Sequence, residues 1–245
     1  MTYCVGMLVD EGLAMIADTR TNAGVDNIST YRKLHVFEKP GEKFLAVATA
    51  GSLSVTQTAL SLLKEGVLDP DTGLVQTLDD CTSVFRAAQL IGHAVRKVRT
   101  DMGPSMQAQS VSYDATLLLG GQFIGGPLQL FMIYGEGNFI ECMPDTPYLQ
   151  IGECKYGKPI LDRSITFRTP LADTLKVGLI SFTSTIRSNL AVGLPLDLVV
   201  VRRGSLEPAS RHRIGLDDAY FRDLGDQWSD ALRAAQTAIA PPPYA

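Results

Sequence analysis

The chain has 245 residues and a formal net charge of −4, and 45% of its residues are hydrophobic. This is the composition of an ordinary globular protein, and no apolar run approaches the roughly 20 residues that a membrane-spanning helix needs. A net negative charge provides no general attraction for nucleic acid, and the one basic run, VRKVR at 95–99, is typical of the solvated face of an amphipathic helix.

The four cysteines are widely spaced and form no metal-binding pattern (Cys4, Cys81, Cys142 and Cys154). Nothing at the start resembles a signal peptide. We therefore expect a cytoplasmic protein with reduced cysteines that binds neither membrane nor nucleic acid and needs no metal or organic cofactor.

The first elements in chain order are predicted strands. Two apolar runs, Thr2–Val9 and Leu13–Asp18, are joined by Asp-Glu-Gly and predict a hairpin. A second pair, Lys33–Glu38 and Lys43–Thr49, flanks Pro40-Gly41 and predicts another hairpin. The stretch ATAGSLS then indicates a corner between a strand and a helix.

Helical spacing of apolar residues predicts a helix directly after this corner and a second over about Thr77–Met102. Four more strands are predicted next: Ala115–Leu119, Leu128–Tyr134, Phe139–Cys142 and Tyr148–Ile151. Thr169 before Pro170 predicts a helix N-cap, with the helix running to about Ala191 and burying residues as far as Leu190. A buried strand, Leu196–Val201, and an amphipathic helix over about 217–239 complete the series before a short tail at 240–245.

Grouped strands and grouped helices favour antiparallel sheets over a parallel sheet with alternating crossovers. The predicted fold class is therefore α+β: two antiparallel sheets packed face to face with helices outside, a four-layer αββα sandwich. No linker interrupts the chain, so residues 1–245 are expected to form a single domain.

The second residue suggests a chemical role for the chain terminus. A threonine hydroxyl is a weak nucleophile until a base accepts its proton. If Met1 is removed, Thr2 gains a free α-amine with a pKa of about 7.7–8.0, on the same Cα as the hydroxyl. Threonine is small enough for methionine aminopeptidase to act on the preceding bond, so the sequence is compatible with removal of Met1, and the proposed chemistry requires it.

Two further residues fit this chemistry. Asp18 ends the second predicted strand and Lys33 begins the third, so a hairpin brings both toward the chain start. A lysine near the hydroxyl favours the developing alkoxide, and Asp18 would hold its ammonium group. The alternative is that Asp18 and Lys33 form an exposed ion pair with little effect.

The sequence resembles the proteasome β-type N-terminal nucleophile hydrolases, and within them the bacterial Anbu (ancestral β subunit) family. The most specific stretches are TYCVGMLVDEGLAMIADTRTNAGVDNISTYRK at the front and IGECKYGKPILDR in the middle. This resemblance implies an αββα fold that cleaves amide bonds, with Thr2 as nucleophile, Asp18 and Lys33 beside it, and Gly51 donating its N–H to the oxyanion.

The supporting residues differ from those of related β subunits. Related β subunits have a serine between two glycines where this chain has Gly152-Glu153-Cys154. They also have an Asp and a Ser near the end of a helix, where this chain has Arg187-Ser188-Asn189, and the alignment there is ambiguous by about one residue. Ser188 is therefore a candidate substitute, and Glu153 is either a new acid near the site or a charge at a strand end. Arg20, in strand phase with Asp18, either supports the charge network or lies on the surface.

The function expected from these residues is a threonine-type, proteasome-like peptidase acting through an acyl ester on Thr2. One alternative is a specialised amidase for a small or peptide-like metabolite, with the same chemistry and another pocket. A second is a non-catalytic self-assembling subunit. The resemblance also implies a homo-oligomer, either a closed ring or an open helical assembly.

Overall fold

The computed structural model describes residues 2–22, 28–70 and 72–244, and ten of its strands form two five-stranded antiparallel sheets. Sheet I has the order β12 (Tyr148–Gly152), β1 (Tyr3–Val9), β2 (Gly12–Asp18), β13 (Leu196–Arg202), β14 (Pro208–Ile214). Sheet II has the order β11 (Phe139–Glu141), β10 (Gln129–Ile133), β9 (Ala115–Phe123), β6 (Lys43–Gly51), β5 (Leu34–Lys39). The α+β class with two antiparallel sheets is confirmed.

Both predicted N-terminal hairpins are present. β1 pairs with β2 from Cys4 opposite Ala17 to Val9 opposite Gly12. β5 pairs with β6 through a turn that places Gly41 at φ +74, a conformation that glycine adopts readily. Every residue of β1 and β2 is buried because these strands have neighbours on both faces, which explains why their sequences are continuously apolar.

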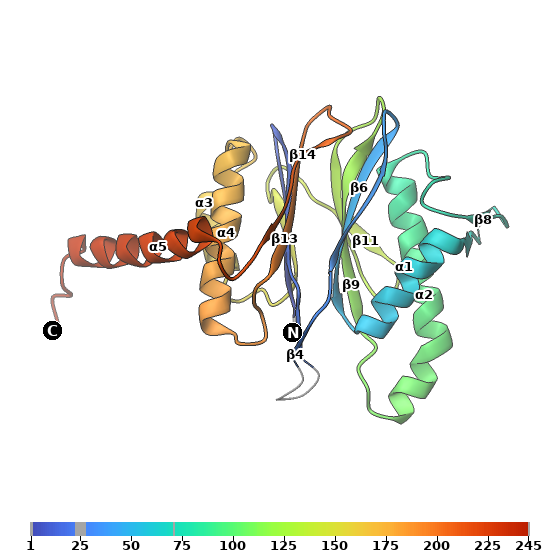
Figure 1. Ribbon diagram of the computed structural model, residues 1–245, viewed down its shortest axis with the longest axis horizontal. Helices are drawn as coiled ribbons and strands as arrows, with labels where there is room; N and C mark the ends of the chain where they lie inside the picture. The colour runs from blue at the N-terminus through green and yellow to red at the C-terminus, as the bar shows by residue number, and fades with distance from the viewer. Residues whose placement is uncertain (1, 23–27, 71, 245) are drawn as a thin grey trace.

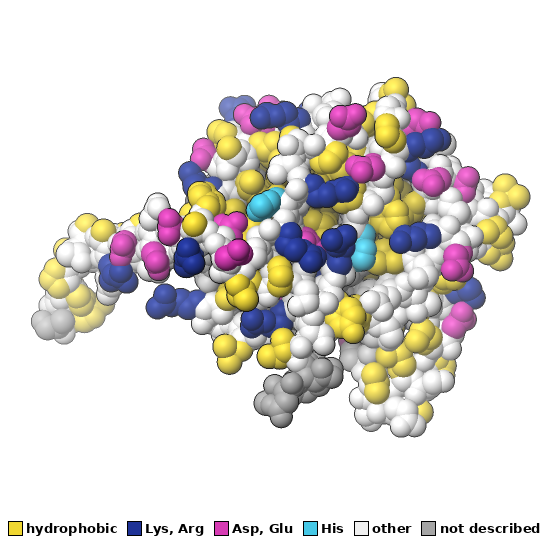
Figure 2. Space-filling view, in the orientation of Figure 1, with side chains coloured by type: hydrophobic (Ala, Val, Ile, Leu, Met, Phe, Trp, Pro, Cys, Tyr) yellow, Lys and Arg dark blue, Asp and Glu magenta, His cyan; other side chains and the backbone are white. Residues whose placement is uncertain are grey.

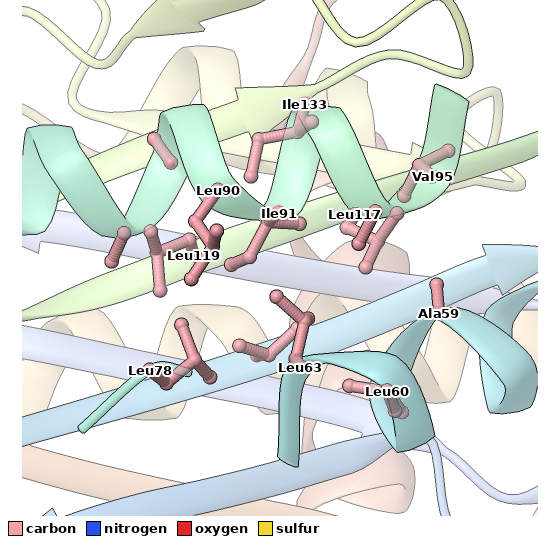
Figure 3. Packing of buried hydrophobic residues seen from close by; sticks show 14 of the residues in the cluster. Ala59, Leu60, Leu63, Leu78, Leu90, Ile91, Val95, Leu117, Leu119 and Ile133 are labelled. Carbon is pink, nitrogen blue, oxygen red and sulfur yellow. The ribbon is translucent and has the colours of Figure 1, made fainter. Parts of the chain in front are cut away.

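The two sheets pack against each other through a shared core. Its members come from both sheets and include Cys4, Leu13, Met15, Phe44, Ala46, Leu118 and Leu130. Helices lie on the two outer sides of this pair of sheets, with α1 (Leu53–Glu65) and α2 (Val84–Ala108) beside sheet II, and α3 (Lys158–Ser164) and α4 (Leu171–Ser188) beside sheet I (Figure 1). Figure 3 shows Leu90, Ile91 and Val95 of α2 packing with Leu117 and Leu119 of β9.

The last helix, α5 (Ala219–Ala238), begins beside α4 and then projects away from the rest of the molecule (Figure 1). Only Phe221 and Leu224 of this helix are buried, whereas Leu232 is 50% exposed and Ile239, directly after it, is 74% exposed. The apolar face predicted for 217–239 therefore exists, but its C-terminal half is uncovered in this single chain.

Three local predictions are wrong. α2 begins at Val84, seven residues after the predicted start, because Ser83 caps the helix by accepting a hydrogen bond from the Arg86 N–H. α4 begins at Leu171 with Pro170 at the N-cap position, and the hydroxyl of Thr169 instead accepts from the Thr166 N–H. Leu190, expected to be buried, follows the end of α4 and is 84% exposed.

Several elements are absent from the prediction because their sequences show no periodic pattern of apolar residues. β14 forms an edge of sheet I with five consecutive exposed residues, so it lacks alternating burial. α3 has seven residues, and the remaining strands are two- or three-residue pairs: β3 (Arg20–Asn22) with β4 (Ile28–Thr30), and β7 (Val67–Leu68) with β8 (Val75–Gln76).

Candidate active site

Thr2 lies directly before β1 and is 8% exposed, so the start of the described chain is held inside the fold. Contacts on both sides fix its backbone. The Tyr3 N–H donates to Asp18 Oδ1 at 3.0 Å on the β2 side, and the Glu153 N–H donates to the Thr2 carbonyl at 2.6 Å on the β12 side. Met1, whose removal the proposed chemistry requires, lies outside the described residues.

Lys33 and Asp18 form a buried ion pair, with Nζ 2.8 Å from Oδ1 and side-chain exposures of 5% and 0%. Lys33 Nζ also donates to the Arg20 carbonyl at 2.6 Å. The exposed ion pair considered as an alternative is therefore not what the fold contains. Removing one member of such a pair leaves an uncompensated buried charge and costs about 3–5 kcal/mol.

The environment of Asp18 acts on its pKa in two directions. Burial raises the pKa of this carboxyl above its ordinary value, while the charge of Lys33, the hydrogen bond from its ammonium group and the backbone N–H groups of Tyr3 and Gly193 oppose that rise. The second oxygen, Oδ2, is buried, and no hydrogen bond of standard geometry reaches it from the described residues. Oδ1 therefore accepts both the hydrogen bond from the Lys33 ammonium and the one from the N–H of Tyr3, the residue following Thr2.

Gly51 ends β6 at the corner where the chain enters α1, as the sequence predicted. Its φ is +103, and a Cβ at this position would lie 2.2 Å from the Asp114 carbonyl oxygen. Only glycine fits there without displacing β9. The Cys4 thiol reaches the Thr49 carbonyl at 3.6 Å, which joins β1 to the end of β6 near this corner.

Arg20 connects the Lys33–Asp18 pair to the loop between α4 and β13. Its backbone carbonyl accepts from Lys33, and its guanidinium donates to the Leu190 carbonyl at 3.0 Å. A Cβ on Gly193 would lie 2.3 Å from Arg20 Cζ, so the absence of a side chain there gives the guanidinium its space. Thr19 Oγ1 holds the same loop through the Pro195 carbonyl at 2.7 Å.

Glu153 is 6% exposed, and each of its two carboxylate oxygens accepts a hydrogen bond. Asn189 Nδ2 donates to Oε2 at 2.9 Å, and the Lys155 N–H donates to Oε1 at 2.9 Å. Ser188, the candidate from the sequence, ends α4 with its side chain exposed. The neighbouring Asn189 was missed, and the only signal for it was the one-residue ambiguity of the alignment.

A basic cleft lies between the edges formed by β5 and β14. It encloses about 300 Å³, has a floor of Leu34, Val36, Leu198 and Val199, and is rimmed by Arg32, Asp197, Arg211, His212 and Arg213. Figure 2 shows Lys and Arg side chains gathered across this face near β13 and β14. Arg213 neutralises Asp197 through two hydrogen bonds of 2.7 and 2.8 Å.

Two searches of the described residues were negative. No group of three or more His, Cys, Asp or Glu side chains in 2–22, 28–70 and 72–244 could hold a metal ion. Within the same ranges, no helix combines the length and the apolarity needed to cross a bilayer.

Comparison with solved structures gives three relatives that cover nearly the whole chain. Anbu (ancestral beta-subunit) from Yersinia bercovieri is 44% identical with a TM-score of 0.88, covering 98% of this chain and 99% of that one. An Anbu (Gly-1) mutant from Hyphomicrobium sp. strain MC1 is 44% identical with a TM-score of 0.89 and the same coverage. A structure described as the helical assembly of the Anbu complex from Pseudomonas aeruginosa is 46% identical with a TM-score of 0.89, covering 98% of both chains.

No protein-family model and no curated protein matches the sequence. The similar structures nevertheless define the class, the proteasome-like N-terminal nucleophile hydrolases, at the level of family. Within that class, the chain belongs to the Anbu (ancestral β-subunit) family.

Proposed function

We propose that this protein is a threonine-type hydrolase that cleaves amide bonds through Thr2 after Met1 has been removed. The fold is then the four-layer αββα sandwich of proteasome β-type subunits, forming one domain over residues 1–245 and working in the cytoplasm. The observation that carries the proposal is the buried Lys33–Asp18 pair, whose shared oxygen also binds the N–H of the residue following Thr2.

In the proposed cycle, Thr2 Oγ attacks the substrate carbonyl carbon while the α-amine of the same residue accepts the hydroxyl proton. The Gly51 N–H stabilises the resulting oxyanion, and Lys33 favours the negative charge that develops on Oγ during attack. The C–N bond then breaks, and the leaving amine takes the proton from the α-ammonium. Water next attacks the ester carbonyl, gives its proton to the α-amine, and the proton returns to Thr2 Oγ as the acid leaves.

Arg20, Glu153 and Ser188 are proposed as supporting residues. The backbone carbonyl of Arg20 binds Lys33, and its guanidinium binds the Leu190 carbonyl, so Arg20 connects the ion pair to the loop after α4. Glu153 is supported by its backbone contact with Thr2. Ser188 has the weakest support, because its side chain is exposed and Asn189 provides the contact with Glu153.

A specialised amidase is the second candidate, and the basic cleft is the observation that favours it. Arg32 lies beside Lys33 in sequence, and Arg211 pairs only loosely with Glu38 at 3.4 Å. Guanidinium groups above an apolar floor suit a small substrate with a carboxylate. Comparing neutral peptides with small amides that carry a carboxylate separates this candidate from a general peptidase.

Self-assembly is also proposed, in accord with the helical assembly described for the relative from Pseudomonas aeruginosa. A cleft of about 310 Å³ between α4 and α5 is lined in part by Ile186, Leu194, Leu216 and Trp228. Together with the exposed apolar side chains of α5, it offers a surface for a second copy of the chain. A closed ring and an open helix are both compatible with this surface.

The direct test is hydrolysis of a mixed panel of peptide and small amide substrates by the wild-type chain, T2A and K97A. Lys97 lies on the outer helix α2, where it pairs with Asp101 on the surface, and serves as the matched control. We expect turnover by the wild type and K97A, and none by folded T2A. Equal turnover by T2A would refute threonine catalysis, whereas no turnover of any substrate by the wild type would leave the non-catalytic subunit as the surviving alternative.

A further inference from the structure

Glu153 lies opposite Thr2 in the β1–β12 ladder. The register pairs Tyr3 with Gly152 and Cys4 with Ile151, so the next pair outward is Thr2 with Glu153. The hydrogen bond from the Glu153 N–H to the Thr2 carbonyl continues this register. In an antiparallel ladder, the N–H and C=O of one residue point toward the same neighbouring strand. The nitrogen of Thr2 therefore faces the segment that carries Glu153.

The contact between these segments is close. Gly152 has a φ of +82, and a Cβ on it would lie 2.0 Å from the Thr2 carbonyl oxygen and 3.4 Å from Thr2 Cβ. Any side chain at this position would push the 152–153 segment away from the chain start. Glycine at 152 thus keeps Glu153 against Thr2.

The Glu153 carboxylate is buried without a cation. Its hydrogen-bond donors among the described residues, the Asn189 amide and the Lys155 N–H, are neutral. Among the ion pairs of the described residues, none includes Glu153. Burying the carboxylate of a residue that is only 6% exposed is costly unless a positive charge compensates it, and hydrogen bonds from neutral groups do so only in part.

We infer that the carboxylate of Glu153 is the counter-ion of the Thr2 α-ammonium, formed when removal of Met1 exposes that amine. This inference rests on the proposed function. An amide nitrogen carries no charge, so the ion pair exists only in the processed chain. Asn189 is then a positioning residue that holds the carboxylate toward the terminus.

The other charged groups around Thr2 do not neutralise the charge of Glu153. On the β2 side, Lys33 and Asp18 neutralise each other. On the β12 side, the titratable neighbours are the half-buried Cys154 and Lys155, whose backbone N–H contacts Glu153. The next cation along the chain is Lys158, which binds Tyr148 and Asp162. From α4, Arg187 is exposed. The guanidinium of Arg20 donates to the Leu190 carbonyl in the loop after α4 and forms no ion pair with Glu153. Glu153 thus has no cationic partner among these groups, and in the processed chain it raises the pKa of the Thr2 amine.

The test measures that pKa directly. An N-terminal ubiquitin fusion, cleaved by a deubiquitinase, yields the full chain beginning at Thr2. The rate of acylation of the α-amine by acetic anhydride is followed against pH by mass spectrometry of the N-terminal peptide. The variants are E153Q, which keeps the shape but not the charge, E153D, which keeps the charge, and E65Q at the exposed end of α1 as control.

We expect the amine pKa of E153Q to fall by about one unit, and that of E65Q to equal the wild type. E153D should lie closer to the wild type than to E153Q. An unchanged pKa in folded E153Q, or an equal fall in E153D, overturns the inference. Labelling does not require hydrolysis, so a shifted pKa in a protein without turnover would contradict the proposed function but not the ion pair.

Discussion

Lys33 Nζ and Asp18 Oδ1 lie 2.8 Å apart inside the protein, and the same oxygen accepts the N–H of Tyr3. One atom thus joins the start of β1, the end of β2 and the residue before β5. These three points are far apart in sequence, and their convergence beside Thr2 is what distinguishes this pair from a surface salt bridge.

Replacing Lys33 with alanine should abolish turnover and also destabilise the fold. The loss of stability should be about 3–5 kcal/mol, because Asp18 would remain buried and charged without its partner. Urea unfolding and hydrolysis assays measure the two effects. The control is K97A, which removes an exposed lysine and should change neither; an active, fully stable K33A would contradict the proposed role.

Replacing Gly51 with alanine should be much more costly than replacing Gly41. Both have positive φ, but a Cβ at 51 meets the Asp114 carbonyl at 2.2 Å, whereas nothing lies within 4 Å of a Cβ at 41. We expect G41A to lose about 1 kcal/mol and G51A several times more, together with turnover. Similar unfolding curves for the two variants would show that the corner tolerates a side chain.

The cysteines should react slowly with thiol reagents in the folded protein. Burial raises the pKa of Cys81 to about 11 and of Cys142 to about 12, and it also raises that of Cys4. At pH 8 the thiolate fraction of a group with pKa about 11 is roughly one in a thousand, and the thiolate is the reactive form. Titration with a chromogenic disulfide reagent should detect at most the half-buried Cys154 in the folded protein and all four thiols after unfolding.

The same shifts predict a loss of stability in alkali. The folded pKa values of these thiols exceed the unfolded ones, so the folded state retains protons that the unfolded state releases. The stabilisation is complete below 9.0, the ordinary pKa of a thiol, and is lost as the pH rises toward about 11, the pKa of Cys81 in the folded protein. Urea midpoints measured from pH 8 to 10.5 should fall less steeply in C81A than in the wild type; equal slopes would contradict the assignment.

Charged residues on the uncovered half of α5 should weaken self-association. Leu232 on this half and Ile239 directly after it are exposed apolar side chains, and glutamate at both positions would place charge in the proposed contact. Light scattering after gel filtration should give a smaller particle for the double variant. The exposed Gln227, changed to glutamate, is the control; an assembly of unaltered size in both variants would mean that α5 is not at the interface.

The parts of the fold that the sequence predicts are those with two-sided burial or clear turn chemistry. β1 and β2 have continuous apolar runs joined by Asp10-Glu11-Gly12, and both the strands and their pairing follow from this. β14 could not be predicted in this way, because an exposed edge strand does not alternate. The start predicted for α2 is too early because Leu78 and Cys81, which lie in the turns before the helix, are buried and have helical spacing.

The sequence predicted that Asp18 and Lys33 lie together near the chain start, and the structure has this contact, while the catalytic roles of the site residues stay predictions. Threonine at position 2, the corner glycine and the paired charges Asp18 and Lys33 each have a specific chemical requirement. The contact to Glu153 depends on where α4 ends, and helix ends are poorly fixed by sequence. Asn189, one residue past Ser188, therefore became apparent only from the three-dimensional arrangement.

The most direct measurement is peptide mapping by mass spectrometry after the purified, hydrolytically active protein has reacted with a peptide epoxyketone, which bonds to both groups of an N-terminal threonine. We predict a single adduct on a peptide that begins with Thr2. Turnover by a chain that keeps Met1, or an adduct on any other residue, would contradict catalysis by the terminal threonine.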